Sequence, residues 1–241
     1  MRLAVISDIH GNMEALEQVM ADIDRSGVDE TVCLGDMIGY GPDPRAVIGC
    51  VQKREIPCVA GNHELAVNDP ACMLEMNLYA RISLKFTRGM LSGKDLDFIR
   101  RLPSFRVLHE CRFVHGFPPD SPIEYLSRIP QNRMRQVMSR MTENICFVGH
   151  THLLGLVEFD GTDLKRTGFK GDSLFLKQNP LYIVNAGSVG QPRDPDKRAK
   201  YVIWDTKTKT VEPRYVDYDR RKTAGKIRDA GLPEIHAHLL L

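Results

Sequence analysis

The sequence lacks any long uninterrupted hydrophobic segment. Across its 241 residues, no run approaches the roughly 18 apolar residues that a membrane-spanning helix needs. The N-terminus starts with a short apolar strand pattern and a charged loop, unlike the basic start and longer apolar stretch of a secretory signal. We therefore expect a cytoplasmic protein with no membrane partner.

Cysteine pairs and surplus charge are also missing. The six cysteines form no CxxC pair, and Cys33, Cys58 and Cys146 lie inside apolar stretches, which favours reduced core residues over disulfides or zinc ligands. The net charge is only +2, so nothing indicates nucleic acid or an anionic membrane as a permanent partner. The hydrophobic fraction of 42% and the charged fraction of 27% are ordinary for a globular protein.

The N-terminal part of the chain alternates between strand and helix patterns. Short apolar stretches predict buried strands at 3–6, 31–34 and 56–60. Helical spacing follows the first of them, with Asn12 as a predicted N-cap, and Asp43-Pro44 predicts the start of a second helix. This β-α-β-α-β order indicates parallel strands with helices on their faces.

Polar residues directly follow each of these three strands. They are Asp8, His10, Asp36 and Asn62. In open α/β sheets, ligands bind beyond the carboxyl ends of the strands, so we expect these side chains to meet in one crevice.

The rest of the chain reads as one domain, 1–241, without internal repeats. A helical insertion is predicted at about 66–103, with Ser92 and Asp95 in capping-box spacing, and we expect it to cover or border the crevice. Further strands are predicted at 105–108, 112–114, 145–148, 153–159, 182–184, 201–204 and 211–216. A helix is expected around Met134 to Met141, and another in the tail, broken at Gly231 to Pro233.

Five of the eight histidines stand at predicted strand ends beside Gly, Asp or Asn. They are His10, His63, His115, His150 and His152. A single histidine of this kind is usually structural, but five together indicate a metal site. In an extended backbone, residues two apart point to the same side, which would bring Asp8 next to His10 and His150 next to His152. Carboxylate, amide and imidazole ligands suit Mn, Fe, Co, Ni or Zn.

Five sequence blocks resemble the signature of calcineurin-like metallophosphoesterases, in order and in approximate spacing. They are Asp8-Ile9-His10, Gly35-Asp36, Gly61-Asn62-His63-Glu64, His115-Gly116 and Gly149-His150-Thr151-His152. The chain is most similar to the small bacterial and archaeal phosphodiesterase or phosphatase branch of that family. The resemblance implies an α/β fold, a four-layer α/β/β/α sandwich of two mixed sheets in a single domain.

The resemblance also implies two divalent transition-metal ions. One would be held by Asp8, His10, Asp36 and His152. The other would be held by Asp36, Asn62, His115 and His150, so that Asp36 bridges the two. We expect manganese first, with iron, nickel, cobalt or zinc as alternatives. A metal-bridging hydroxide would attack phosphorus in line. By analogy His63 would protonate the leaving oxygen, and its alternative role is a hydrogen bond to a metal ligand.

Two loops are candidates for substrate contacts. The glycine-rich segment 187–194 contains Arg193, which would clamp a phosphate through two parallel hydrogen bonds; the alternative is a surface turn with a solvated arginine. Asn62 is the second predicted substrate contact. Tyr40 in the turn 39–42 would stack on a substrate if it lies near the crevice, but a plain turn is favoured. We expect no metal role for His236 and His238.

One difference from a related family block indicates which branch of the family this sequence resembles. Phosphoprotein phosphatases carry a GDxVDRG block whose Asp orients the catalytic histidine and whose Arg binds phosphate, and this sequence has Gly39 and Tyr40 at those places. The difference argues against a Ser/Thr protein phosphatase and leaves the orientation of His63 open. It also makes Arg193 the predicted phosphate anchor.

The predicted function is a metal-dependent phosphoesterase that hydrolyses a small phosphodiester, nucleotide or phosphomonoester. One alternative is a non-catalytic metal-binding scaffold for protein partners, and the other is a nuclease. The sequence lacks an extended basic and aromatic stretch, which argues against a stable nucleic-acid partner. The basic run 220–222 is interpreted as a solvated helix face. The sequence carries no indication of the oligomeric state.

Overall fold

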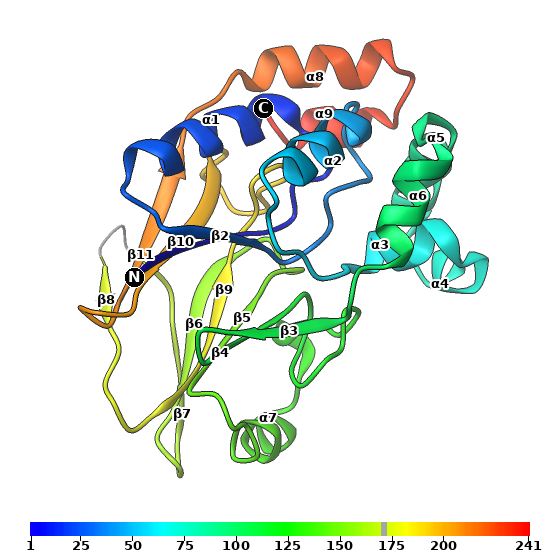
Figure 1. Cartoon of the computed structure of the whole chain (residues 1–241). Coiled ribbons are helices and arrows are strands. Elements are labelled where there is room, and N and C mark those ends of the chain that lie inside the picture. The colour runs from blue at the N-terminus through cyan, green and yellow to red at the C-terminus, as the bar shows by residue number, and fades with distance from the viewer. Residues whose placement is uncertain (170–172) are drawn as a thin grey trace.

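Two mixed β-sheets form the centre of the computed structural model, which describes residues 1–169 and 173–241 (Figure 1). The strands of the first sheet are β1 (Arg2–Ile6), β2 (Glu30–Cys33), β8 (Leu174–Phe175), β10 (Ala199–Asp205) and β11 (Thr210–Val216). Those of the second are β3 (Phe105–Leu108), β4 (Cys111–Val114), β5 (Ile145–Val148), β6 (Leu154–Phe159), β7 (Leu164–Thr167) and β9 (Leu181–Ala186).

Each sheet combines parallel strands with antiparallel ones. The spatial orders are β2-β1-β10-β11-β8 and β3-β4-β5-β9-β6-β7. Strands β1 and β2 are parallel, as are β4, β5 and β9, whereas β10 and β6 run antiparallel to their neighbours. The parallel strands therefore end at the same edge of the molecule.

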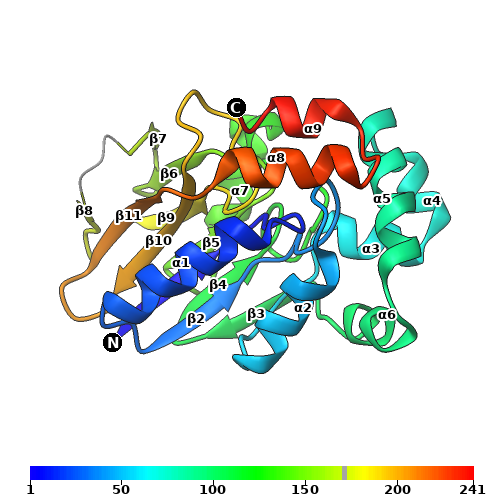
Figure 2. The same ribbon diagram turned by 90° about the horizontal axis from the view of Figure 1, so that it is seen from above.

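Helices cover the outer faces of both sheets (Figures 1 and 2). On the outer side of the first sheet lie α1 (Met13–Arg25), α2 (Pro44–Lys53), α8 (Arg220–Asp229) and α9 (Glu234–His238). The outer side of the second sheet is covered by α7 (Gln131–Met138). Beside both sheets lie α3 (Asn62–Asn68), α4 (Pro70–Leu74), α5 (Leu78–Met90) and α6 (Gly93–Arg100). The fold is the expected four-layer α/β/β/α sandwich in a single domain.

Strand β1 shows why the buried strands read as continuous apolar runs. Leu3 and Val5 face the second sheet, whereas Ala4 and Ile6 face the layer of α1 and α2. All four side chains are fully buried, because helices cover one face and a sheet the other. Burying a side chain of the size of Leu3 contributes about 1.5–3 kcal/mol.

The prediction of a strand at 56–60 is wrong. The segment makes a single parallel bridge to β2, Cys33 to Cys58, with backbone hydrogen bonds from Cys33 N to Pro57 O and from Val59 N to Cys33 O. Pro57 has no N–H to extend the ladder, which explains why pairing stops there. The polar edge strand β7 and the two-residue strand β8 were not predicted.

Helix starts follow the predicted caps with one exception. Asn12 caps α1 by accepting from the Ala15 N–H at 3.1 Å, and Ser92 with Asp95 forms the predicted capping box of α6. Asp43 stands at the N-cap of α2, but its carboxylate pairs with Lys226 instead of the helix. Within the described parts of the chain, every helix is too short or too polar to cross a bilayer. Cys33, Cys58 and Cys146 are buried free thiols, as expected.

Candidate metal centre

The loops after β1, β2, β4 and β5 meet at the shared edge of the two sheets. Among them they carry Asp8, His10, Asp36, His115, His150 and His152, and α3 begins there with Asn62 and His63. Backbone hydrogen bonds join the loops, from Asp8 N to Gly35 O at 3.1 Å and from Gly149 N to His115 O at 2.8 Å. The structure thus brings all the predicted ligands to one place.

The local backbone differs from the extended geometry expected at these residues. Left-handed φ angles occur at Asp8 (53°), His10 (49°), Asp36 (50°), His150 (64°) and His152 (62°). The same-side rule for extended chains is therefore the wrong reason for their convergence. Left-handed conformations of non-glycine residues cost about 1–3 kcal/mol each and persist where the surrounding structure enforces them.

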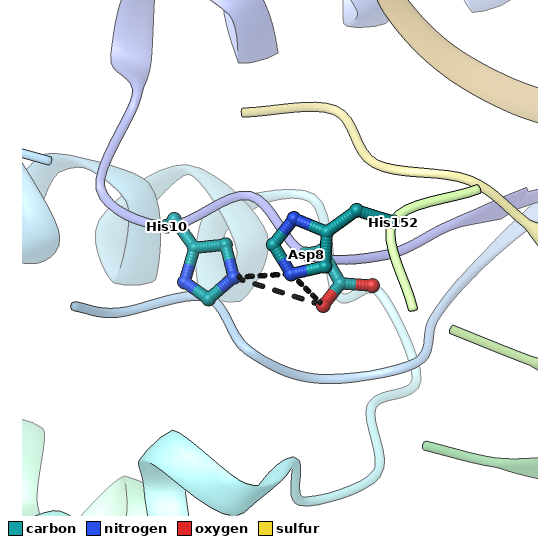
Figure 3. A group of neighbouring side chains, drawn as sticks. All are labelled: Asp8, His10 and His152. Carbon is teal, nitrogen blue, oxygen red and sulfur yellow. Dashed lines mark hydrogen bonds and ion pairs between the residues drawn. The ribbon is translucent and has the colours of Figure 1, made fainter. Parts of the chain in front are cut away.

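Asp8 forms one half of the cluster with two histidines (Figure 3). Its Oδ1 lies 3.1 Å from His152 Nε2 and 3.6 Å from His10 Nε2, and the two Nε2 atoms are 3.2 Å apart. Its Oδ2 accepts hydrogen bonds from the Ser7 hydroxyl at 2.7 Å and from His150 N at 2.9 Å. Oδ2 of Asp8 therefore accepts hydrogen bonds from the surrounding backbone and Ser7, whereas Oδ1 faces the two histidines.

Asp36 is arranged in the same way in the other half. Its Oδ1 accepts from His63 N at 2.9 Å, and its Oδ2 lies 3.3 Å from His115 Nε2 and 3.7 Å from His10 Nε2. His115 Nε2 in turn lies 3.2 Å from His150 Nδ1. The free oxygen of Asp36 thus faces both halves of the cluster.

Backbone carbonyls fix which nitrogen each histidine presents. The acceptors for His10, His115, His152 and His150 are the carbonyls of Ile38, Leu34, Gln191 and Ile123, respectively. A carbonyl only accepts, so the bonded ring nitrogen carries the proton and the opposite nitrogen presents a lone pair. His10, His115 and His152 present Nε2, and His150 presents Nδ1.

In each half of the cluster, two histidine nitrogens therefore face each other across 3.2 Å with their lone pairs. They are Nε2 of His10 and Nε2 of His152 in one half, and Nε2 of His115 and Nδ1 of His150 in the other. Such pairs repel unless a cation lies between them. The buried Oδ1 atoms of Asp8 and Asn62 likewise have no hydrogen-bond donor within the described residues. Buried acceptors of mixed carboxylate, amide and imidazole type, with their second nitrogens bound to carbonyls, fit transition-metal ions.

The titratable groups of the site have strongly shifted pKa values. Burial raises the pKa of Asp36, but the neighbouring His115 and His63 outweigh it and hold the pKa well below its usual range. Burial lowers the pKa of His150 to about 3. Burial also opposes a charge on His115, yet the carboxylates of Asp36 and Asp8 raise its pKa to about 9. At a pKa of about 9, a proton occupies His115 Nε2 at neutral pH when no metal ion is bound, so the position between the two carboxylates favours a positive charge, either a proton or a metal ion.

His63 is held by packing rather than by a carboxylate. Its ring contacts His10 and Tyr40 edge to face, with centroids 4.7 Å away in both cases. A Cβ at Gly39 would lie 2.1 Å from His63 Nδ1, so only glycine leaves room for this imidazole. His63 Nε2 lies 3.9 Å from Asp36 Oδ2. Residue 39 is not an aspartate that could orient His63, and two aromatic contacts hold the imidazole instead.

Glu64 has a structural role that the sequence interpretation missed. Its buried carboxylate accepts hydrogen bonds from Asp36 N at 2.7 Å, Met37 N at 2.8 Å and Gly61 N at 2.9 Å. Burial, followed by the charge of Asp36, raises its pKa to about 7. The spacing of Glu64 three residues after the N-cap Gly61 is the signal that predicts such a contact.

The glycine-rich loop with Arg193 is anchored at the site. Ser188 donates to Asp8 O at 2.8 Å, and Gly190 N donates to the same oxygen at 2.9 Å. Desolvation would lower the pKa of Arg193, but the neighbouring phenols of Tyr40 and Tyr125 raise it. Arg193 as a whole residue is exposed, although its guanidinium is partly desolvated, and none of the ion pairs found among the described residues involves it. Its guanidinium is therefore available to an anion.

Tyr40 corrects both interpretations of the turn 39–42. Its side chain is only 6% exposed, and its ring lies between His10, at a centroid distance of 4.3 Å, and His236, at 4.5 Å. Its ring is buried against three histidine rings, those of His10, His63 and His236, which leaves no open ring face for stacking and rules out a plain surface turn.

The tail histidines separate in the structure. His236 is buried beside Tyr40, whereas His238 is exposed. Neither belongs to the histidine and carboxylate groups found among the described residues. No local pattern predicted the burial of His236, because a chain reversal after α8 brings it to the site.

Known proteins share this architecture. The profile of the calcineurin-like phosphoesterase superfamily domain matches residues 1–209. The protein MJ0912 of Methanocaldococcus jannaschii is 33% identical over 239 residues, which cover 96% of this chain and 94% of that protein. A metallophosphoesterase from Sphaerobacter thermophilus is 33% identical, has a TM-score of 0.83 and is matched over 98% of its length by all of this chain. PH1004 from Pyrococcus horikoshii, 21% identical with a TM-score of 0.78, shares the fold over 99% of this chain and 97% of its own.

Proposed function

Because this chain belongs to the calcineurin-like phosphoesterase superfamily, we propose that it hydrolyses a small phosphate ester at a centre of two divalent metal ions. The substrate would be a phosphodiester, a nucleotide or a phosphomonoester. The two pairs of facing imidazole nitrogens, each next to the free oxygen of an aspartate, are the main support for this proposal.

The proposed ligand sets follow the two halves of the cluster. The first comprises Asp8, His10, Asp36 and His152, and the second comprises Asp36, Asn62, His115 and His150. Asp36 would bridge, because its Oδ2 faces both His10 and His115. Manganese is proposed first, and iron, nickel, cobalt or zinc would fit the same ligands.

When bound, the ions would supply an activated water and neutralise the phosphoryl oxygens. His63 would give a proton to the leaving oxygen. Burial lowers the pKa of His63 well below its ordinary value, and the charge of Asp36 only partly opposes this, so without bound metal or substrate the neutral imidazole is favoured. Arg193 would bind a phosphoryl oxygen from the exposed side of the site, and Asn62 would contact the same group.

The helices α3 to α6 are proposed to act as an insertion that borders the substrate. Asn62 and His63 form the first turn of α3, and the Ser83 hydroxyl of α5 accepts a hydrogen bond from Tyr40 N at 3.1 Å. Replacements on α4 to α6, which carry none of the proposed metal ligands, should therefore change substrate preference more than metal affinity.

The test is hydrolysis of paired chromogenic substrates, a phosphomonoester and a phosphodiester, by metal-stripped protein to which Mn, Ni, Co, Zn or Mg is returned. We expect manganese to restore turnover in the wild type, and Asp36→Asn to abolish it. His63→Ala should retain the metal but lose about 100-fold or more in kcat.

The matched control is His109→Ala, which removes an exposed histidine paired with Glu30. It should leave turnover unchanged. Stoichiometric metal binding without hydrolysis of any ester would contradict the proposal and leave a metal-binding scaffold instead.

A further inference from the structure

The C-terminal helices lie outside the part of the chain that matches the superfamily profile. That match ends at residue 209, whereas α8 and α9 span Arg220–Asp229 and Glu234–His238. Figure 2 shows α8 running beside α1 toward α5, and α9 running back from that side to the C-terminus.

Helix α8 is fixed to the start of α1, next to the loop that carries Asp8 and His10. The Thr223 hydroxyl donates to Asn12 Oδ1 at 3.1 Å, and Lys226 Nζ donates to Glu14 Oε1 at 3.0 Å. Lys226 also pairs with Asp43 at the start of α2. Thr223 and Glu14 are both buried, so this contact is part of the protein interior.

Helix α9 is fixed to the loop that carries Arg193. Gln191 connects them: its side-chain amide donates to His236 O at 3.2 Å, and its backbone carbonyl accepts from His152 Nδ1. Gln191 is itself 3% exposed. One residue thus contacts the terminal helix, the ligand His152 and, through the chain, Arg193.

The His236 ring covers the outer face of Tyr40. The centroids of the His236 and Tyr40 rings are 4.5 Å apart, and the His10 ring also packs on Tyr40, at a centroid distance of 4.3 Å. Burial lowers the pKa of His236 to about 4, so at neutral pH it is an uncharged packing surface. Tyr40 has a left-handed φ of 61°, which only a surrounding clamp maintains.

We propose that His236 is a positioning residue: it clamps Tyr40 against His10 so that the Tyr40 hydroxyl and Arg193 contact the same substrate phosphoryl group. Contacts within the site join Tyr40 to the loop of Arg193: Gln191 O accepts from His152, whose ring stacks on His10 at 4.9 Å, and the His10 ring in turn lies 4.3 Å from that of Tyr40. Helix α9 is thereby part of the substrate pocket although it carries no metal ligand. This inference rests on the proposed phosphoesterase function.

The first experiment compares His236→Ala with His238→Ala in the manganese-loaded full chain. Both change a histidine of α9, but only His236 contacts Tyr40. For His236→Ala we expect KM to rise roughly three- to tenfold, the size of one lost aromatic contact, with a smaller change in kcat and an unchanged metal content. His238→Ala should match the wild type, and His236→Phe should restore most of the KM.

A double-mutant cycle separates positioning from general loosening of the tail. If His236 acts through the Tyr40 hydroxyl, Tyr40→Phe alone should raise KM, and adding His236→Ala should raise it little further. Independent effects that multiply in the double variant would overturn the inference. Thermal unfolding of each variant shows whether a change in KM follows a loss of stability.

Binding of inorganic phosphate, measured by calorimetry with manganese present, distinguishes this inference from the proposed function. Weaker phosphate binding by His236→Ala than by His238→Ala supports the positioning role even if the chromogenic esters are not hydrolysed. Equal phosphate affinity in both variants would reject the role of His236 while leaving the phosphoesterase proposal intact.

Discussion

At the scale of single residues, the missing side chain at residue 39 determines where His63 lies. Gly39 has a left-handed φ of 85°, and an added Cβ would overlap the imidazole. Tyr40, the next residue, then packs on the ring edge. The pair Gly39-Tyr40 thus provides space and support where a carboxylate would otherwise orient the histidine.

Gly39→Ala should therefore displace His63 without touching a metal ligand. We expect kcat to fall about 100-fold, as for loss of a general acid, while two manganese ions per chain remain bound. Steady-state kinetics and metal analysis of the purified variant check this. Gly49→Ala is the control, because nothing lies within 4 Å of a Cβ at that helical position. A Gly39→Ala variant with wild-type kcat would show that His63 does not take part in turnover.

At the scale of elements, Asp22 joins α1 to β10 and β11. Its carboxylate accepts from the Tyr201 hydroxyl at 2.8 Å and from Arg214 at 2.9 and 3.1 Å. Burial raises the pKa of Asp22, but the hydrogen bonds from Arg214 and Tyr201 outweigh it and lower the pKa below its ordinary value of 3.8. The ionised form of Asp22 therefore stabilises the packing of α1 on the first sheet.

Asp22→Asn should reduce the free energy of unfolding by about 2 kcal/mol at neutral pH, the size of hydrogen bonds to a charged group. Because the folded pKa is lowered, the contribution is complete above pH 3.8 and disappears as the pH falls through the folded pKa. Urea unfolding at several pH values should show the difference from wild type shrinking below that pH. Arg25→Ala, which removes a more distant and exposed partner at 3.8 Å, should change little. A difference that is constant with pH would contradict this account.

At the scale of the whole molecule, the proposed metal ligands come from both sheets. Asp8, His10 and Asp36 follow strands of the first sheet, and His115 and His150 follow strands of the second. Bound ions would hold the two sheets together at this edge. Metal binding should therefore be coupled to global stability.

Chelation followed by return of manganese tests this coupling by calorimetry. With free manganese about 100-fold above its Kd, one site adds about 2.7 kcal/mol, which raises Tm by about 5–10 °C for a chain of this size. Asp36→Asn should show a much smaller rise, because the shared ligand is lost. An identical rise in both proteins would mean that manganese stabilises through some other site.

Much of this architecture follows from the sequence by itself. Buried strands appear as continuous apolar runs because both of their faces are covered, as at Leu3 to Ile6. Polar residues after those runs predict a common site, because parallel strands end at one edge. Local caps at Asn12 and Ser92 were predictable, since capping needs only neighbouring residues.

Tertiary structure decided the remaining features, because they depend on contacts between distant parts of the chain. The tautomers of the histidines depend on carbonyls that lie up to 81 residues away, as for His115 and Leu34. The left-handed backbone at Asp8 and His10 follows from their bonds to the neighbouring loop. His236 reaches Tyr40 only because α8 docks on Asn12 and Glu14 and returns the chain to the site. The sequence thus determined which residues form the site, and the packing of distant segments determined how each of them faces it.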